Sequence, residues 1–313
     1  MGAEYLVTGG AGFIGSNLVR RLAGQGGRIR VFDDLSSGRL ENLAGLEPSV
    51  EFVRGNLRDA SAVHAALRGI RHVFHAGAIA SVQASVDDPL ATHEVNITGT
   101  LNVLLAARAA GAERVVFSSS ASIYGDDPEM PKREDMRPAP LTGYALSKLA
   151  GEHYGRIFHG LYGLKFFALR YFNVFGPRQD PASHYAAVIP LFLRAYAAGR
   201  QPTIFGDGEQ TRDFTFVEDV VAANLACLSA PESAAGGVYN IAYGERVSVN
   251  DLARQIAALA GQPFAPAYAP ARPGDIRESQ ADSTLARRVL GWTPAHCFAA
   301  GLRTTWDWFA SRA

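Results

Sequence analysis

Short apolar runs, many of them β-branched, alternate with longer stretches of helical period through the first half of the chain. Strands are expected at 5–8, 29–33, 50–54, 73–75, 115–118 and 166–170, and helices at 12–24, 60–68, 88–110 and 144–161. Continuous apolar strands that alternate with helices are typical of a parallel sheet covered on both faces. The first half is therefore predicted to form a doubly wound α/β domain.

The pattern changes after about residue 172. Loops rich in Gly and Pro separate isolated helices, which we expect at 186–199, 218–229, 249–260 and 282–290. No second alternation of strands and helices follows. The sequence therefore predicts a first domain at 1–172 and a smaller C-terminal α+β lobe at 173–313, packed against the end of the sheet. This boundary is soft, because elements of the second half could return to the first domain.

Composition narrows the class of protein. The 313 residues include 30 Lys or Arg and 30 Asp or Glu, so the net charge is zero and gives no general attraction to nucleic acid or anionic lipid. Two distant cysteines and eight histidines without ligand spacing indicate neither a disulfide framework nor a metal site. Without a basic leader or a run of about twenty apolar residues, we expect a cytoplasmic protein that does not cross a membrane.

The first predicted strand runs into a glycine loop, with glycines at positions 9, 12 and 15. Such a loop lets a pyrophosphate approach the backbone, and the following helix N-terminus supplies N–H groups. The alternative is a plain strand-to-helix turn. Asp33 ends the next strand, where a carboxylate accepts hydrogen bonds from ribose hydroxyls and repels a 2′-phosphate. NAD is therefore expected rather than NADP, although Arg39 nearby leaves NADP open.

For two polar residues, the sequence does not decide between a cofactor contact and a role in a turn. Asp34 either joins the cofactor site or caps a turn. Asn56, at the end of the third strand, either bonds an adenine amine or satisfies its own turn.

Tyr144 and Lys148 stand one helical turn apart, on the same face of a predicted helix. A nearby cation stabilises phenolate and lowers the pKa of a tyrosine, as a general base requires. Such pairs also occur on solvated helices. However, Ser118, Ser120 and Ser122 follow a predicted parallel strand, at the edge where open α/β sheets bind ligands. Together with the glycine loop, the order favours a catalytic role.

With these motifs in order, the chain resembles the extended short-chain dehydrogenases/reductases, and among them the nucleotide-sugar 4-epimerases. The resemblance rests on a set of positions that spans essentially the whole chain. These are Gly9, Gly12, Gly15, Asp33, Asn96, Ser120, Tyr144 and Lys148, then Asn173 in RYFNVFGPRQDP, Arg212 in GEQTRDFTFVEDV, and Arg272 and Asp275 in RPGD. It implies a Rossmann domain, an NAD cofactor and a UDP-sugar substrate.

The resemblance also implies which residues form the site. Those expected to hold NAD are Gly9, Gly12, Phe13, Ile14, Gly15, Asp33, Asp34, Ser37, Gly38, Asn56, Leu57, Ala76, Ala78, Asn96, Ser118, Tyr144, Lys148 and Tyr171. Those expected to bind the UDP-sugar are Ser81, Ser120, Ser122, Tyr144, Asn173, Ala187, Val188, Thr203, Phe205, Arg212, Arg272, Asp275 and Ser279. From the residues alone, Arg212 and Arg272 are either diphosphate ligands or surface ion-pair partners, and Phe205 is either a site residue or ordinary core.

As the resemblance implies, Tyr144 takes the proton of the sugar 4-hydroxyl, Lys148 holds the phenolate, and Ser120 bonds the 4-oxygen. The sugar passes through a 4-keto intermediate, and NAD stays tightly bound because it is regenerated. The small Ser279 leaves room for an acetamido group, and the segment at 185–190 is similar to that of UDP-N-acetylglucosamine 4-epimerases. We therefore expect UDP-GlcNAc/UDP-GalNAc interconversion, with UDP-Glc/UDP-Gal also accepted or the true reaction.

Related reactions remain as alternatives. The sugar 4,6-dehydratases carry an Asp-Glu pair where this chain has Ala121 and Ser122. A uronic-acid epimerase is disfavoured by Asp180, which would repel the sugar carboxylate, but Arg178 nearby keeps that option open. A non-catalytic NAD-sensing protein and a reductase with exchangeable NADPH also remain. Relatives pair the helices at 88–110 and 144–161 between subunits, so we expect a homodimer.

Overall fold

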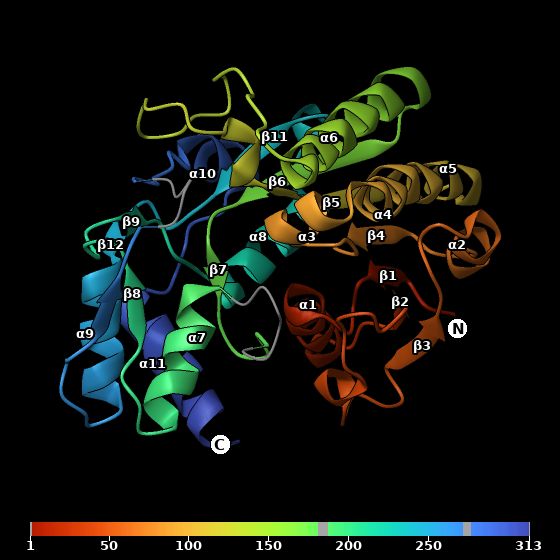
Figure 1. Ribbon diagram of the computed structural model, residues 1–313. Helices are drawn as coiled ribbons and strands as arrows, with labels where there is room; N and C mark the ends of the chain where they lie inside the picture. Colours follow the sequence, from red (N-terminus) through yellow and green to blue (C-terminus); the bar gives the residue numbers. More distant parts are fainter. Residues whose placement is uncertain (1, 181–186, 272–276, 313) are drawn as a thin grey trace.

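A seven-stranded sheet organises the first lobe of the protein (Figure 1). The computed structural model describes residues 2–180, 187–271 and 277–312. The strands of this sheet are β1 (Tyr5–Thr8), β2 (Ile29–Asp33), β3 (Val50–Arg54), β4 (His72–His75), β5 (Arg114–Ser120), β6 (Lys165–Tyr171) and β11 (Val238–Ile241). Their order is β11-β6-β5-β4-β1-β2-β3, and each neighbouring pair is parallel. The doubly wound Rossmann-like fold is confirmed, and each strand expected in the first half is present.

Helices cover both faces of this sheet. One face packs against α1 (Phe13–Gly24), α8 (Val217–Ser229) and α10 (Thr284–Leu290), and the other packs against α2 (Ala60–Ala66), α5 (Gly99–Ala110) and α6 (Gly143–Tyr162). The central strands are apolar on both sides because both sides are buried, which is why they appear in the sequence as apolar runs. The edge strand β3 is less buried and keeps Glu51 exposed.

The expectation of one helix over 88–110 is wrong. The segment consists of α4 (Pro89–His93), a π-helical turn (Glu94–Thr98) and α5, and an additional helix, α3 (Val82–Asp87), precedes it. A π turn inserts one extra residue into the helix and shifts the direction of the side chains after it. Here it lies where Asn96 turns inward to buried partners.

The second half of the chain contributes elements to both lobes. The four-residue strand β11 lies beside β6 at the edge of the central sheet, and α10 packs against it. With α8, these elements belong to the first lobe. A single division at residue 172 therefore does not describe the sheet, and the return that the sequence left open is found in β11, α8 and α10.

The second lobe lies to the left in Figure 1 and is built around a separate apolar core. Its helices are α7 (Val188–Ala197), α9 (Val249–Leu259) and α11 (Phe298–Ala310). Three short strand pairs join them: β7 (Val174–Phe175) with β10 (Thr215–Phe216), β8 (Thr203–Phe205) with β13 (Ala267–Ala269), and β9 (Thr211–Arg212) with β12 (Val247–Ser248). The strands β8 and β9 thus carry three residues expected to bind the substrate, Thr203, Phe205 and Arg212.

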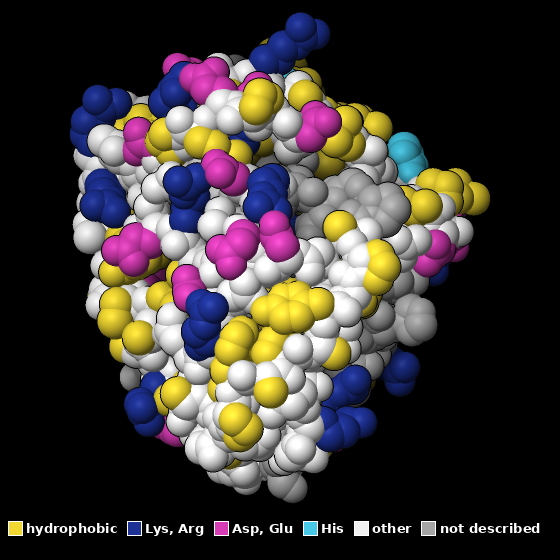
Figure 2. All heavy atoms as spheres, turned by 60° about the vertical axis from the view of Figure 1, so that its left-hand side comes forward, with side chains coloured by type: hydrophobic (Ala, Val, Ile, Leu, Met, Phe, Trp, Pro, Cys, Tyr) yellow, Lys and Arg dark blue, Asp and Glu magenta, His cyan; other side chains and the backbone are white. Residues whose placement is uncertain are grey.

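On the face that Figure 2 brings forward, acidic and basic side chains lie interspersed around apolar ones. Within the described part of the chain, no helix combines the length and apolar character needed to cross a membrane. The same residues contain no group of three or more His, Cys, Asp or Glu side chains placed to hold a metal ion.

Candidate active site

The loop between β1 and α1 is compact because glycine occupies its crowded positions. Gly9 has a φ of +66°, and a Cβ there would lie 2.7 Å from the backbone of Gly77. A Cβ on Gly15 would lie 2.2 Å from the carbonyl oxygen of Gly9. The N-cap residue of α1, Gly12, provides no side-chain cap, and the first turn carries no acidic residue. The first-turn N–H groups are therefore free of side-chain acceptors from their own turn, which suits an anionic group such as a pyrophosphate.

Asp33 ends β2 beside this loop. Its carboxylate accepts hydrogen bonds from the backbone N–H groups of Ala11, at 3.0 Å, and Leu35, at 2.9 Å. Burial raises the pKa of the Asp33 carboxyl, and these two hydrogen bonds oppose that rise. A Cβ on Gly38 would lie 2.9 Å from a carboxylate oxygen, so the following loop must pass closely over Asp33. Ser37, on that loop, is exposed.

Asp34 and Asn56 bond to each other. The Asn56 amide donates to the Asp34 carboxylate at 2.9 Å, and the other Asp34 oxygen accepts from the Ser36 N–H. The Asn56 side-chain oxygen accepts from the Arg58 N–H at 3.0 Å. These contacts match the turn-satisfying interpretation of both residues. They also fix the ends of β2 and β3 beside Asp33.

Asn96 connects α6 to the loop after β4. Its side-chain oxygen accepts from Ile79 N–H at 2.8 Å, and its amide donates to Ile79 O at 3.1 Å and to Ser147 Oγ at 3.0 Å. Both amide protons are thus bound to protein atoms. The structure gives Asn96 a role in holding α6 in place, beside the expected contact with a cofactor.

His75 is a buried part of the scaffold. Thr100 Oγ1 donates to Asn96 O at 2.6 Å, so it accepts from His75 Nε2 at 2.9 Å. Thr8 Oγ1 accepts from Gly77 N–H and so donates to His75 Nδ1 at 2.7 Å. Burial, followed by the charge of Lys148, lowers the pKa of His75 to about 3. The imidazole is therefore neutral, and its tautomer is set by these partners.

Ser120, Tyr144 and Lys148 come together at the carboxyl end of β5. The Ser120 hydroxyl lies close enough to the Tyr144 phenol to oppose the rise of its pKa. Lys148 is 4% exposed, and its Nζ donates to Ser118 O at 2.8 Å and lies 5.7 Å from the centre of the Tyr144 ring. Ser120, Tyr144 and Lys148 thus form one cluster, as their order and spacing in the sequence predicted.

The electrostatics of this cluster differ from the expectation. Burial raises the pKa of the Tyr144 phenol, the Ser120 hydroxyl opposes that rise, and Lys148 is not among the causes of the shift. Burial also lowers the pKa of Lys148 to about 8. Burial thus outweighs the expected effect of Lys148, whose ammonium bonds to Ser118 O rather than to the phenol.

Tyr171 lies opposite Ser120 in the β5–β6 pairing. Its hydroxyl lies 3.3 Å from Ser118 Oγ and accepts from the Asn224 amide at 2.8 Å. Burial raises its pKa. Tyr171 thus connects the carboxyl edge of β5 to α8.

The remaining residues expected at the cofactor site surround the glycine loop. Phe13 and Ile14 pack partly against the second lobe's core, and Ala76 N–H donates to Thr8 O at 3.2 Å. Ala78 is half-buried. Leu57 is buried against Gly99, where a Cβ would lie 2.7 Å from Leu57 Cβ. These side chains line up along the carboxyl edge of the sheet.

A cavity of about 410 Å³ opens in the second lobe, beyond the end of β6. Six residues expected to bind the substrate line it: Asn173, Ala187, Val188, Thr203, Phe205 and Arg212. Asn173 has a φ of +30°, and its amide donates to Asp213 O at 3.2 Å. Residues from separate segments of the chain thus form one pocket of the size of a ligand site.

Sequence reasoning missed two glutamines of this cavity. Gln210 donates to Phe205 O at 2.7 Å, while its buried side-chain oxygen has no partner among the described residues. Gln179 donates to Val174 O at 3.3 Å and likewise leaves a buried oxygen unpaired within the described chain. Both stand within motifs already singled out, GPRQDP and GEQTR, which was the available signal.

Other expected substrate residues lie elsewhere. Ser81 caps α3, where its Oγ accepts from Ala84 N–H at 3.0 Å, and Ser122 donates to Ser120 Oγ at 3.0 Å. Ser279 is half-buried and, like those two, does not line the 410 Å³ cavity. Arg272 and Asp275 lie outside the described residues.

Asp180 forms an ion pair with Arg39 at 2.7 Å. This contact joins the loop after β2 to the segment after β7. It also weakens the argument that Asp180 repels a sugar carboxylate, because part of its charge is balanced by Arg39.

Comparisons with known proteins agree with this geometry. The profile of the NAD dependent epimerase/dehydratase family matches residues 5–242. The chain is 44% identical to a UDP-glucose 4-epimerase of Mycolicibacterium smegmatis, over 98% of this chain and 99% of that protein. The structure of a UDP-N-acetylglucosamine 4-epimerase from Methanobrevibacter ruminantium M1, in complex with UDP-N-acetylmuramic acid, superposes with a TM-score of 0.94 and 39% identity, covering 100% of both chains.

A UDP-glucose 4-epimerase of Thermus thermophilus, solved with NAD, superposes with a TM-score of 0.89 and 39% identity over 99% of each chain. Family profile, sequence and structure point the same way. The chain belongs to the NAD-dependent epimerase/dehydratase family.

Proposed function

We propose that this protein is an NAD-dependent UDP-sugar 4-epimerase. The observation that carries the proposal is the Ser120–Tyr144–Lys148 cluster at the edge of the sheet that also holds the glycine loop. The 410 Å³ cavity begins at Asn173, two residues after β6 ends at that edge. The cavity and the cluster thus both lie at the carboxyl end of the β5–β6 strand pair.

The residues around the glycine loop fit NAD. The loop approaches its neighbours too closely for any side chain at Gly9 or Gly15, which leaves backbone N–H groups facing outward. Asp33 presents a buried carboxylate for ribose hydroxyls, and its negative charge disfavours a 2′-phosphate. These residues would hold NAD, which would supply reversible hydride transfer at carbon 4 of the sugar.

The chain's own residues handle the proton and the substrate. Tyr144 takes the proton of the 4-hydroxyl and returns it, and Ser120 donates a hydrogen bond to the same oxygen. Lys148, with a pKa of about 8, is mostly protonated at neutral pH and stabilises the phenolate form of Tyr144, which accepts that proton. The nucleotide is held in the cavity by Asn173, Phe205 and Arg212 while the 4-keto sugar turns over.

For the substrate we propose UDP-GlcNAc/UDP-GalNAc, with UDP-Glc/UDP-Gal as a second pair. The small side chain of Ser279 supports the larger acetamido sugar. The names of the relatives include both a UDP-glucose and a UDP-N-acetylglucosamine 4-epimerase. UDP-glucuronate is the alternative substrate. It is favoured by the Arg39–Asp180 ion pair, because Arg39 balances part of the Asp180 charge that would repel the sugar carboxylate.

The experiment is incubation of the purified enzyme with UDP-GlcNAc, UDP-Glc and UDP-GlcA in separate tubes, followed through the anomeric signals by NMR. We expect equilibration of UDP-GlcNAc with UDP-GalNAc without added cofactor and without net oxidation. Conversion of UDP-GlcA alone would replace the substrate assignment. No conversion of any of the three would overturn the proposed function.

We further propose that the protein is a homodimer formed through α5 and α6. Large apolar side chains are exposed along these helices: Leu105 is 41%, Ile157 50% and Leu161 71% exposed. A second copy would cover such a face. Sedimentation analysis is expected to give twice the mass of one chain, and Leu161→Glu is expected to shift the protein toward the monomer.

A further inference from the structure

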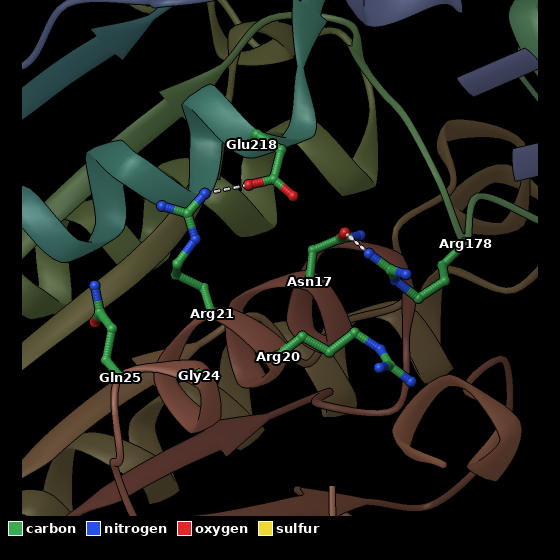
Figure 3. A pocket seen from close by; sticks show the side chains of 7 residues that line it. All are labelled: Asn17, Arg20, Arg21, Gly24, Gln25, Arg178 and Glu218. Carbon is green, nitrogen blue, oxygen red and sulfur yellow. Dashed lines mark hydrogen bonds and ion pairs between the residues drawn. The ribbon is translucent and has the colours of Figure 1, made fainter. Parts of the chain in front are cut away.

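A second cavity, of about 440 Å³, lies between α1 and α8 (Figure 3), and none of Ser120, Tyr144 and Lys148 lines it. Its lining residues are Asn17, Arg20, Arg21, Gly24, Gln25, Arg178 and Glu218. None of them lines the 410 Å³ cavity. The proposed 4-epimerase reaction uses neither this cavity nor these side chains.

Positive charge dominates this cavity. Three guanidinium groups face one carboxylate, Glu218, which is already bound by Arg21. In Figure 3, that pair lies on one side, and the guanidinium groups of Arg20 and Arg178 lie on the other. A fourth arginine, Arg312, lies close enough to act on Arg178. Like charges held together raise the free energy of the folded protein unless an anion offsets them.

Arg178 has an unpaired buried donor and a left-handed backbone conformation. Its Nε is buried without an acceptor among the described residues, and Asn17 Oδ1 accepts from its Nη2. Its backbone has a φ of +70°, which is uncommon for a residue with a side chain. Burial, then the charge of Arg20, lowers the pKa of the guanidinium to about 10, so it stays charged at neutral pH. Unpaired buried donors and left-handed backbone are typical of functional sites.

Arg20 supplies a further donor. Its Nε donates to Asn42 O at 3.0 Å and its Nη2 donates to Ala44 O at 2.9 Å, and these two bonds fix the guanidinium plane. The remaining nitrogen, Nη1, has no acceptor within the described ranges. Arg178 Nη1 likewise has no acceptor among the described residues. Two guanidinium groups that each offer an unused Nη1 match the oxygens of a phosphate group, which arginine binds with a planar fork of donors.

We propose that this cavity binds the phosphate group of a small anion, through Arg20 and Arg178. Its volume exceeds that of a phosphate ion and accommodates a phosphorylated metabolite. The ligand would join α1 to the segment that leads into the second lobe. Asn17 already connects them, since its amide donates to both Phe13 O at 2.9 Å and Pro177 O at 3.1 Å.

The test is isothermal titration of the enzyme that carries NAD and is saturated with UDP, so that the nucleotide sites do not contribute. Inorganic phosphate and glycerol 3-phosphate are titrated separately at constant ionic strength. Arg20→Gln is expected to weaken binding about tenfold, because one charge-assisted contact is lost, and Arg178→Gln to weaken it at least as much. Tighter binding of glycerol 3-phosphate than of inorganic phosphate would indicate that other parts of the cavity contribute to the affinity.

Arg133→Gln is the matched control, because the side chain of Arg133 is 41% exposed and pairs with Glu129 on the segment before α6. Its affinity is expected to equal that of the parent. Absence of binding, parental affinity in the two cavity variants, or an equal loss in the control each overturns the proposal. If Arg178→Gln lowers the melting temperature, Arg20→Gln decides the outcome, because it leaves the Arg178–Asn17 bond in place.

Discussion

Glu152 binds Arg170 through both carboxylate oxygens, at 2.9 and 2.8 Å, and neither side chain is more than 3% exposed. Glu152 lies one turn after Lys148 on α6 and also accepts from Ser119 Oγ at 2.5 Å. Arg170 continues the chain of contacts by donating to Tyr124 OH at 2.8 Å. This buried pair thus joins the catalytic helix to β5 and β6 directly behind the Ser120–Tyr144–Lys148 cluster.

The first prediction concerns this pair. Glu152→Gln leaves the buried guanidinium of Arg170 without its counter-charge, so we expect a loss of about 3–5 kcal/mol in the free energy of unfolding. Urea denaturation measures it. Glu51→Gln is the control, because Glu51 pairs with Arg30 at 2.9 Å while its side chain is 54% exposed. A surface pair contributes little, so equal losses in the two variants would contradict the assigned importance of the buried pair.

A second prediction tests the glycine loop. Gly15→Ala places a methyl group 2.2 Å from Gly9 O, so the loop must shift away from α1. We expect weaker NAD retention through purification and a lower melting temperature. Gly160→Ala is the control: Gly160 lies within α6 with no heavy atom within 4 Å of its Cβ position. Alanine there is expected to stabilise the protein by roughly 0.5–1 kcal/mol.

The sequence predicted the parts of the structure that depend on local pattern. The six strands expected in the first half lie within two residues of their predicted ends, because burial on both faces gives most of them an apolar run. Gly15 and Asp33 could also be predicted from the local sequence. A strand, a tight turn and a helix follow each other directly along the chain, so their side chains are placed by neighbours in sequence.

The strand β11 and the π turn before α5 could not be predicted, because contacts between distant segments of the chain determine them. The strand β11 contains Asn240, a polar residue that interrupts the apolar pattern, and its amide bonds to Lys132 O at 2.9 Å and Asp282 O at 3.2 Å. The π turn before α5 contains Asn96, which reaches Ile79 and Ser147. Those contacts depend on segments that are distant in sequence, and no local period reports them.

The third prediction follows from the depressed pKa of Lys148. Its pKa falls from 10.5 to about 8 on folding, so between these values the unfolded chain binds more protons. The free energy of unfolding should therefore rise with pH across this window, by about 3 kcal/mol from this group. Lys148→Met removes the titrating group. The difference in stability between the two proteins, measured by urea denaturation from pH 7 to 10.5, is expected to change with that slope.

The fourth prediction concerns the proton transfer. Tyr144→Phe removes the phenol and keeps the ring, so kcat is expected to fall about 100-fold or more while NAD stays bound. NMR of the UDP-sugar mixture measures the rate. Tyr162→Phe is the control on the same helix, since Tyr162 is 46% exposed. Retention of activity by Tyr144→Phe would remove this residue from the mechanism.

The last prediction separates substrate binding from chemistry. Val188, the first residue of α7, lines the 410 Å³ cavity, so Val188→Trp fills space that the nucleotide is proposed to occupy. We expect KM for the UDP-sugar and Kd for UDP to rise about tenfold or more, because the larger ring excludes part of the ligand. The value of kcat at saturation should change little, since Ser120, Tyr144 and Lys148 come from other elements. Ala197→Trp adds the same ring at the exposed end of α7 and should leave both constants unchanged. An equal rise in KM in the two variants would place the nucleotide elsewhere.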